Sequence, residues 1–328
     1  MKIRVLGAGY YGCHLAASLL SDGHDVQVWE IKDRIFGGAS GNIPARMHSG
    51  QHYPRSKATR DACQKHMPEF MTVYGQFTRH IPTNIYAIAE DKSMVDYGNY
   101  IKVLAGDIQF IEIDPNEYGL RHCEGAILTQ ERHIVTDEVR KHFEKVLDGH
   151  ILFNKPIDVV DSPEFDLTVD ATFCANDSAG IDRYEPCIVG ILRGPTNMAC
   201  TIMDGEFGSV YPWNESNGFN SLSSAKYTPF SKSCKTYEEA NQIINSLSMV
   251  EQMDRLQEMY DDLMHFYPAL SDYEIVAPRL SIRAMPLSGA DSRLVDVVEV
   301  GERAVRVRAG KIDAVVHAEQ IIKERYIK

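Results

Sequence analysis

The chain has 328 residues, and at about 150 residues per domain this length predicts two domains. Asp and Glu number 46 against 34 Lys and Arg, which gives a net charge of −12. This acidic balance weighs against duplex nucleic acid as a partner, because phosphate backbones are bound mainly through Lys and Arg.

Seven cysteines are dispersed along the chain without a Cys-x-x-Cys pair, which is typical of reduced thiols in a cytosolic protein. The first apolar run is too short for a signal peptide. No stretch approaches the roughly 18 apolar residues of a membrane-spanning helix. We therefore expect a cytoplasmic protein that acts on a small molecule and has no membrane segment.

The start of the chain follows a strand–turn–helix–strand pattern. Apolar residues at 3–6 predict a strand, residues 7–12 a turn, and helically spaced leucines a helix that ends at Gly23. A second strand is expected over residues 26–30. This βαβ arrangement requires a parallel sheet.

Apolar spacing further along predicts helices over residues 57–75 and 136–147, the second with Thr136 as its N-cap. Strands are expected over residues 85–89, 108–113, 157–160 and 167–169.

The second half of the chain changes character. Gly, Pro, Ser and Asn separate short β-like runs over residues 186–234, which favours an antiparallel sheet. The longest helical pattern covers residues 237–264. We expect one amphipathic helix packed on the sheet, with a homodimer interface as the alternative.

Gly7, Gly9 and Gly12 form a Gly-x-Gly-x-x-Gly motif between the first strand and the first helix. In a dinucleotide site the first glycine permits a tight turn, the second lets the pyrophosphate approach, and the third lets helix and strand pack closely. Glu30 is placed to accept hydrogen bonds from ribose hydroxyls, and its charge disfavours NADP. The expected dinucleotide site also includes Tyr10, Tyr11 and Ile31.

The next segment favours FAD over NAD. Residues 37–42 (Gly-Gly-Ala-Ser-Gly-Asn) are small, so their backbone N–H groups can approach a phosphate or a ring. Together with the spacing from Gly7 to Glu30, they resemble the second glycine segment of the D-amino acid oxidase superfamily. The resemblance implies FAD contacts from Gly38, Ala39, Ser40, Asn42, Arg46 and His48.

Later segments resemble the same superfamily. Residues 166–172 are similar to the strand and turn that close its FAD domain, and residues 156–160 lie where the family flanks the adenine. Residues 310–312 resemble the last glycine turn beneath the flavin in glycerol-3-phosphate dehydrogenases, where a helix N-terminus stabilises negative charge. The resemblance adds Ile157, Ala171, Thr172, Gly310, Lys311 and Ile312 to the expected FAD contacts.

A narrower resemblance comes from residues 45–56 and 201–209, which are similar to FAD-dependent oxidoreductases encoded with polysaccharide-biosynthesis genes. The implied fold is an α/β, Rossmann-like FAD-binding domain interleaved with an α+β substrate domain whose sheet is mostly antiparallel. The implied FAD-binding segments are 1–56, 125–185 and 285–328, and the implied substrate-domain segments are 57–124 and 186–284.

Candidate substrate contacts follow from the chemistry of this superfamily, in which a hydride passes to the flavin and the protein orients the substrate. Arg283 lies where related oxidases carry an Arg that clamps the substrate carboxylate, and Arg279 is the competing choice. Tyr211, on the predicted antiparallel sheet, is a candidate hydrogen-bond partner of the substrate.

His48 and His52 follow the expected flavin loop. His48 is a candidate for orienting the substrate or taking a proton, and either His is a candidate for covalent attachment of the flavin. Gly50 and Pro54 argue against a helix that would place both imidazoles on one face, so no metal site is expected.

The sequence therefore predicts an FAD-dependent oxidoreductase that oxidises a C–N or C–OH bond of a small amine, amino acid, hydroxy acid or sugar-linked substrate. One alternative is a flavin oxidase or lyase that acts on an amino-acid-modified nucleotide or base. Others are a non-catalytic flavin-binding interaction protein and an NAD-dependent dehydrogenase. The substrate, the final electron acceptor, the mode of flavin attachment and the oligomeric state stay open.

Overall fold

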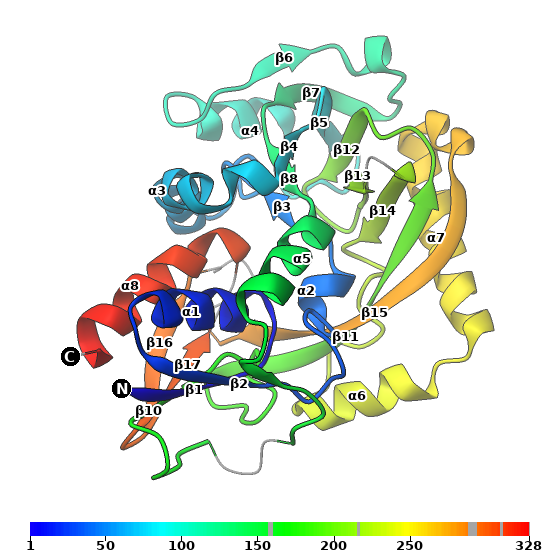
Figure 1. The fold of residues 1–328 in the computed structure, drawn as a ribbon. Helices are drawn as coiled ribbons and strands as arrows, with labels where there is room; N and C mark the ends of the chain where they lie inside the picture. The colour runs from blue at the N-terminus through cyan, green and yellow to red at the C-terminus, as the bar shows by residue number, and fades with distance from the viewer. Residues whose placement is uncertain (157–159, 215–216, 288–293, 309–310, 328) are drawn as a thin grey trace.

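A computed structural model describes the chain apart from residues 157–159, 215–216, 288–293, 309–310 and 328. Two large sheets organise it (Figure 1). A six-stranded sheet has the order β16-β17-β10-β1-β2-β9, and an eight-stranded sheet has the order β15-β11-β14-β13-β12-β5-β7-β6. A small third sheet has the order β3-β8-β4.

The six-stranded sheet is mainly parallel and collects strands from the start, middle and end of the chain. Its strands are β1 (Lys2–Leu6), β2 (Asp25–Trp29), β9 (Ile151–Leu152), β10 (Leu167–Asp170), β16 (Asp296–Gly301) and β17 (Ala304–Arg308). The antiparallel strand β16 forms one edge. The connection from β1 to β2 is α1 (Tyr10–Ser21), as the βαβ pattern predicts.

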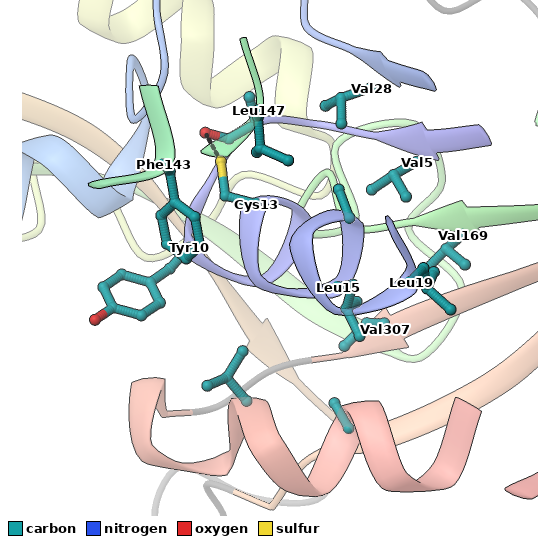
Figure 2. Close-up of a cluster of buried hydrophobic side chains, with 14 of the residues drawn as sticks. Val5, Tyr10, Cys13, Leu15, Leu19, Val28, Phe143, Leu147, Val169 and Val307 are labelled. Carbon is teal, nitrogen blue, oxygen red and sulfur yellow. Dashed lines mark hydrogen bonds between the residues drawn. The ribbon is translucent and has the colours of Figure 1, made fainter. Parts of the chain in front are cut away.

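Helices α1 and α8 (Val315–Tyr326) lie together over one face of this sheet (Figure 1). Leu15 and Leu19 of α1 are buried with Val5, Val169 and Val307 from three neighbouring strands (Figure 2). Branched residues suit strands that are buried, and burial of each such side chain stabilises the fold by about 1.5–3 kcal/mol. This core fixes the start of α1 at the carboxyl ends of β1 and β2.

The eight-stranded sheet is mostly antiparallel, as expected for residues 186–234. Its strands are β5 (Thr83–Ala89), β6 (Ile111–Ile113), β7 (Cys123–Thr129), β11 (Ile181–Arg193), β12 (Met198–Met203), β13 (Gly208–Asn214), β14 (Phe219–Ser224) and β15 (Glu274–Pro286). One pairing, β5 with β12, is parallel. The expected strand over 108–113 is shorter, because only residues 111–113 pair with β7.

A small sheet and further helices complete the fold. The small sheet holds β3 (Arg46–Met47), β4 (Thr78–His80) and β8 (Arg132–Ile134), and the helices are α2 (Ala39–Asn42), α3 (Lys57–Tyr74), α4 (Tyr97–Leu104), α5 (Thr136–Val146), α6 (Tyr237–Ser246) and α7 (Met249–Phe266). Among the residues with a described position, no helix has both the length and the apolar character needed to span a bilayer.

Two sequence predictions about helices were wrong. Residues 237–264 do not form one helix but α6 and α7, because Ser248 and Glu251 form a capping box that starts a new helix. Thr136 is the first residue of α5 and not its cap, since Val135 holds the N-cap position without a side-chain hydrogen bond. The expected strand over 157–160 lies almost wholly outside the described residues.

Candidate active site

The first glycine turn packs directly against the turn that follows β10. Gly7 has φ +92°, and a Cβ at this position would lie 3.0 Å from the carbonyl oxygen of Ala171. Thr172 donates its hydroxyl and its backbone N–H to Oδ1 of Asp170. Only glycine lets the chain turn this close to the neighbouring strand. The structure therefore brings residues 7–12 and 171–172 together, as the sequence predicts.

The other two glycines of the motif are also needed for close approach. A Cβ on Gly12 would lie 1.8 Å from the carbonyl oxygen of Gly7, and a Cβ on Gly9 would lie 3.2 Å from Oγ of Ser40. Gly9 is the N-cap of α1 and offers no side chain to its first turn. The N–H groups and the positive end of this helix are therefore suited to a phosphate.

The second glycine segment is fastened to the first. The backbone N–H of Tyr10 donates to Oγ of Ser40 at 2.9 Å, and that of Phe36 donates to the carbonyl of Ala8 at 2.9 Å. Asn42 stabilises the segment from within by donating to the carbonyl of Gly38 at 2.9 Å. Ala39 begins the short helix α2 that these contacts place beside α1.

Glu30 lies at the end of β2 with its carboxylate turned to the first turn. Its Oε2 accepts from Ala8 N–H at 2.6 Å and its Oε1 accepts from Lys32 N–H at 2.7 Å. A carboxylate has about four acceptor positions, so capacity for ribose hydroxyls remains. Ile31, which follows, is 61% exposed and so lies at the rim of this region.

The C-terminal turn reaches the same place. The hydroxyl of Tyr11 donates to the carbonyl of Lys311, and Ile312 begins a short 3-10 helix (Ile312–Ala314) that leads into α8. Gly310 and Ile157 lie outside the described residues. Four segments far apart in sequence thus converge at one edge of the parallel sheet, and their close backbone packing fits the pyrophosphate and ribose of FAD.

His48 is held by a buried carboxylate and a tyrosine. Its Nδ1 lies 3.1 Å from the hydroxyl of Tyr86 and 3.3 Å from Oε2 of Glu131. Tyr86 donates to the same Oε2 at 2.6 Å, and Ser49 N–H donates to Oε1 at 2.7 Å. Glu131 is 1% exposed, and burial raises its pKa, while the bonds from Tyr86 and Ser49 act in the opposite direction.

His52 stacks on His48 with ring centroids 4.6 Å apart. Burial lowers the pKa of His52 well below its ordinary value, and the neighbouring His48 and Arg46 lower it further, so this imidazole is neutral. Tyr53 contacts both rings edge-on, at 5.6 Å from His48 and 5.1 Å from His52. Across the described part of the chain, no group of three or more His, Cys, Asp or Glu is arranged to hold a metal ion.

Lys311 connects this cluster to the glycine turns. Its ammonium lies 4.8 Å from the centre of the Tyr53 ring, while its carbonyl accepts from Tyr11 at the start of α1. The His48 cluster therefore borders the region that fits FAD.

The side chain of Arg46, on β3, contacts β13 of the eight-stranded sheet. Its Nη2 donates to Oγ of Ser209 at 2.8 Å, and its guanidinium lies 4.2 Å from the centre of the Tyr211 ring. Tyr211 is fully buried, so it meets the site through its ring face beneath Arg46. Residues 45–56 and 201–209 meet a second time where Arg55 Nε donates to Asp204 at 2.6 Å. The two segments that share the narrower resemblance are thus neighbours in space.

The two candidate arginines on β15 have different surroundings. Arg283 is paired with Glu185 of β11, which accepts from its Nε at 3.0 Å and also from its Nη2. Arg279 pairs in register with Val189 and is exposed. The structure therefore pairs the half-buried Arg283 with the buried carboxylate of Glu185 and leaves Arg279 on the surface.

Sequence reasoning missed several members of this site: Tyr53, Tyr86, Glu131 and Glu185. Glu131 lies in the turn between β7 and β8, and no local motif marks it. Glu131 comes beside His48 through the pairing of β3 with β8. That pairing is a tertiary contact, so spacing along the chain does not reveal it.

Comparisons with known proteins agree with this geometry, although no protein-family model matches the chain. The chain is 31% identical over 334 residues to FAD-dependent monooxygenase FPY4 of Fusarium mangiferae, covering 98% of this chain and 90% of that protein. Glycine oxidase from Geobacillus kaustophilus has a similar fold (TM-score 0.71, 12% identity, 99% of this chain and 94% of that chain). So does L-proline dehydrogenase from P. horikoshii (TM-score 0.72, 13% identity, 100% and 94%).

These similarities confirm the expected fold and cofactor, and they overturn the NAD-dependent and non-catalytic alternatives. The chain belongs to the family of FAD-dependent oxidoreductases that includes FPY4, and it shares the fold of glycine oxidase and L-proline dehydrogenase.

Proposed function

We propose that this enzyme oxidises a C–N or C–OH bond of a small substrate by hydride transfer to FAD. The observation that carries the proposal is the His48–Glu131–Tyr86 cluster, which contains a proton-accepting group oriented by a buried carboxylate. It borders the glycine turns through Tyr53 and Lys311.

FAD, when bound, supplies the acceptor for the two electrons that leave the substrate carbon as a hydride. The protein must hold the substrate and take the proton of its hydroxyl or amine. In the proposed reaction His48 accepts that proton, and the double bond C=O or C=N remains on the product. An imidazole is a competent proton acceptor at neutral pH.

Glu131 acts through His48. Its Oε2 lies 3.3 Å from Nδ1, so it orients the ring and stabilises the charge that forms when the imidazole takes a proton. Tyr86 bonds to both groups and holds the pair in one geometry. His52, neutral and stacked on His48, excludes water from one face of the ring.

The experiment is an anaerobic screen of the flavin-loaded enzyme with amino acids, secondary amines, 2-hydroxy acids, aldoses and modified nucleosides. We expect one class to bleach the visible flavin band, and oxygen to restore it. If dithionite bleaches the flavin but no compound does, hydride transfer from these classes is wrong. A response to modified nucleosides alone would favour the nucleotide alternative.

The name of the relative FPY4 favours a second candidate, monooxygenation. The two reactions differ in the fate of oxygen. Under isotopically labelled O2, an oxidation by hydride transfer leaves the label in hydrogen peroxide, whereas a monooxygenase places one labelled atom in the organic product. Mass spectrometry of the product separates them.

A further inference from the structure

We propose that one side of the eight-stranded sheet beside His48 binds an uncharged, polyhydroxylated substrate, with Asn84 and Thr201 as the residues that select it. The inference rests on the proposed function, because it concerns the substrate of the same site. It narrows the proposed substrate classes to alcohols that carry at least one hydroxyl besides the one that is oxidised.

The strand register places Thr201 on the proposed substrate side. Its strand, β12, lies between β5 and β13 in the sheet (Figure 1). Thr201 lies opposite Tyr86 of β5 and opposite Ser209 of β13, and opposite residues on paired strands project to the same side. The hydroxyl of Tyr86 lies 3.1 Å from Nδ1 of His48. Ser209 accepts from Arg46 at 2.8 Å, so Thr201 lies between a partner of His48 and a partner of Arg46.

Asn84 extends the same side of the sheet. It precedes Tyr86 by two positions on β5, and alternate residues of a strand project to one side. Thr129 of β7 lies directly opposite Asn84. Burial raises the pKa of Tyr211, and the nearby amide of Asn84 acts in the opposite direction, although the two groups are not in good hydrogen-bonding geometry. Asn84 therefore lies between Thr129 and Tyr211.

The polar atoms of this group of side chains are buried without partners. Both amide atoms of Asn84 and the hydroxyls of Thr129, Thr201 and Tyr211 form no hydrogen bond with any of the described residues. Asn84 and Tyr211 are fully buried, and the two threonines are at most 5% exposed. Nearly all buried polar groups in folded proteins are paired, because an unpaired one has lost its water without compensation. A cluster of such atoms therefore indicates a polar ligand.

The unpaired atoms favour hydroxyl groups as that ligand. The amide of Asn84 offers a donor and an acceptor side by side, and each threonine or tyrosine hydroxyl can do both. A hydroxyl of the substrate also donates and accepts, whereas a carboxylate only accepts and an ammonium only donates. The four side chains are uncharged, so a buried ion among them would lack a counter-charge from this group, which is costly.

The charges that border this group do not favour an ion of either sign. Glu131 raises the pKa of Tyr211 and Arg46 lowers it, so a negative and a positive group both lie near its hydroxyl. In the proposed complex the alcohol that is oxidised faces His48. Another hydroxyl of the same molecule then bonds to Thr201 or Asn84.

The test uses binding and not turnover. Erythritol, 1,4-butanediol, which lacks the two inner hydroxyls, and the dianion succinate are titrated calorimetrically into the flavin-loaded enzyme. We expect erythritol to bind more tightly than either of the others. Thr201→Val, which replaces one hydroxyl by a methyl group of similar size, should weaken erythritol by about 3- to 10-fold. Asn84→Leu, which removes a donor and an acceptor, should weaken it by about 10- to 100-fold.

Unfolding in urea separates a binding role from a structural one. The hydroxyls of Thr201 and Thr129 bond to no described residue, so Thr201→Val and Thr129→Val should unfold at the same urea concentration as wild type or higher. The matched control is Thr228→Val, because the Thr228 hydroxyl accepts from Ser224 N–H at 3.0 Å. That variant should lose stability and still bind erythritol as wild type does. If Asn84→Leu does not fold, Thr201→Val carries the test.

Unchanged erythritol affinity in folded Thr201→Val and Asn84→Leu enzymes would overturn the inference. Tighter binding of succinate than of erythritol, no binding of erythritol to wild type, or a loss of stability in Thr201→Val without a loss of affinity would also overturn it. The proposed oxidation fails separately. If both variants weaken erythritol but no compound bleaches the wild-type flavin, then the hydroxyl-binding site stands and the reaction does not.

Discussion

The region that fits FAD and the proposed substrate side are built from different groups, the first from backbone and the second from side chains. The region that fits FAD is made mainly of backbone: glycine turns, a helix N-terminus and carbonyl contacts at the edge of a parallel sheet. The proposed substrate side is made of side chains from β3, β5, β8, β13 and their connecting turns. A backbone site tolerates almost no added atom, whereas a side-chain site depends on charge and hydrogen bonding.

The largest effect is expected where a single methyl group meets backbone. Gly12→Ala places a Cβ 1.8 Å from the carbonyl oxygen of Gly7, far closer than two unbonded atoms can approach. Either α1 or the first turn must move, so we expect loss of bound FAD and little folded protein. Gly98→Ala is the matched control, since it is exposed and its Cβ would meet nothing closer than 3.4 Å. Flavin absorbance per protein and yield check both, and normal flavin content in Gly12→Ala would refute the steric account.

The substrate side should respond in rate and not in flavin content. We expect His48→Asn to slow flavin reduction by about 10²–10⁴-fold, the usual contribution of a general base. Glu131→Gln should slow flavin reduction less and shift its pH profile. The reason is that the amide, unlike the carboxylate, does not stabilise the protonated ring of His48. Rapid mixing under anaerobic conditions measures both, with the exposed His80→Asn as control. Equal rates in His48→Asn and wild type would remove His48 from the mechanism.

One buried ion pair tests whether the FAD side depends on side chains as well. Arg306 Nε lies 2.8 Å from Asp170, and both side chains are at most 2% exposed. Arg306→Met leaves the Asp170 carboxylate without its buried partner, which costs about 3–5 kcal/mol of unfolding free energy. Urea unfolding measures the loss. The double variant with Asp170→Asn should recover part of it, and the exposed Arg303→Met should change little.

The smallest effect is expected at the contact between α1 and α8. Burial opposes ionisation of Glu319, but hydrogen bonds from His14, Lys323 and Ser18 lower its pKa to about 2 from an ordinary 4.5. A depressed carboxyl pKa stabilises the fold above pH 4.5, and this stabilisation is lost as the pH falls towards 2. Glu319→Gln should remove about 1–2 kcal/mol at neutral pH and flatten stability between these values. The exposed Glu324→Gln should leave the pH dependence of urea unfolding as it is in wild type.

The same difference between the regions explains what the sequence could predict. Gly7, Gly9, Gly12 and Glu30 form a local pattern, so the βαβ unit and its cofactor are visible without a structure. The division of residues 237–264 into two helices was missed, because the capping box of Ser248 interrupts a continuous apolar periodicity.

The substrate side left no comparable local signal. Glu131 meets His48 only through pairing of β3 with β8, and Glu185 meets Arg283 only through the register of β11 with β15. Charge pairing across strands cannot be derived from spacing along the chain, so the sequence named Arg283 as the clamp without its partner. The boundaries of the five domain segments and the roles of individual site residues stay predictions.

The central claim is that the backbone region and the side-chain cluster form one active site. A crystal structure of the flavin-loaded enzyme tests it most directly. The account predicts the pyrophosphate at the N-terminus of α1 and the flavin ring between the Lys311 turn and the His48 cluster. A flavin ring placed away from the His48 cluster would contradict it.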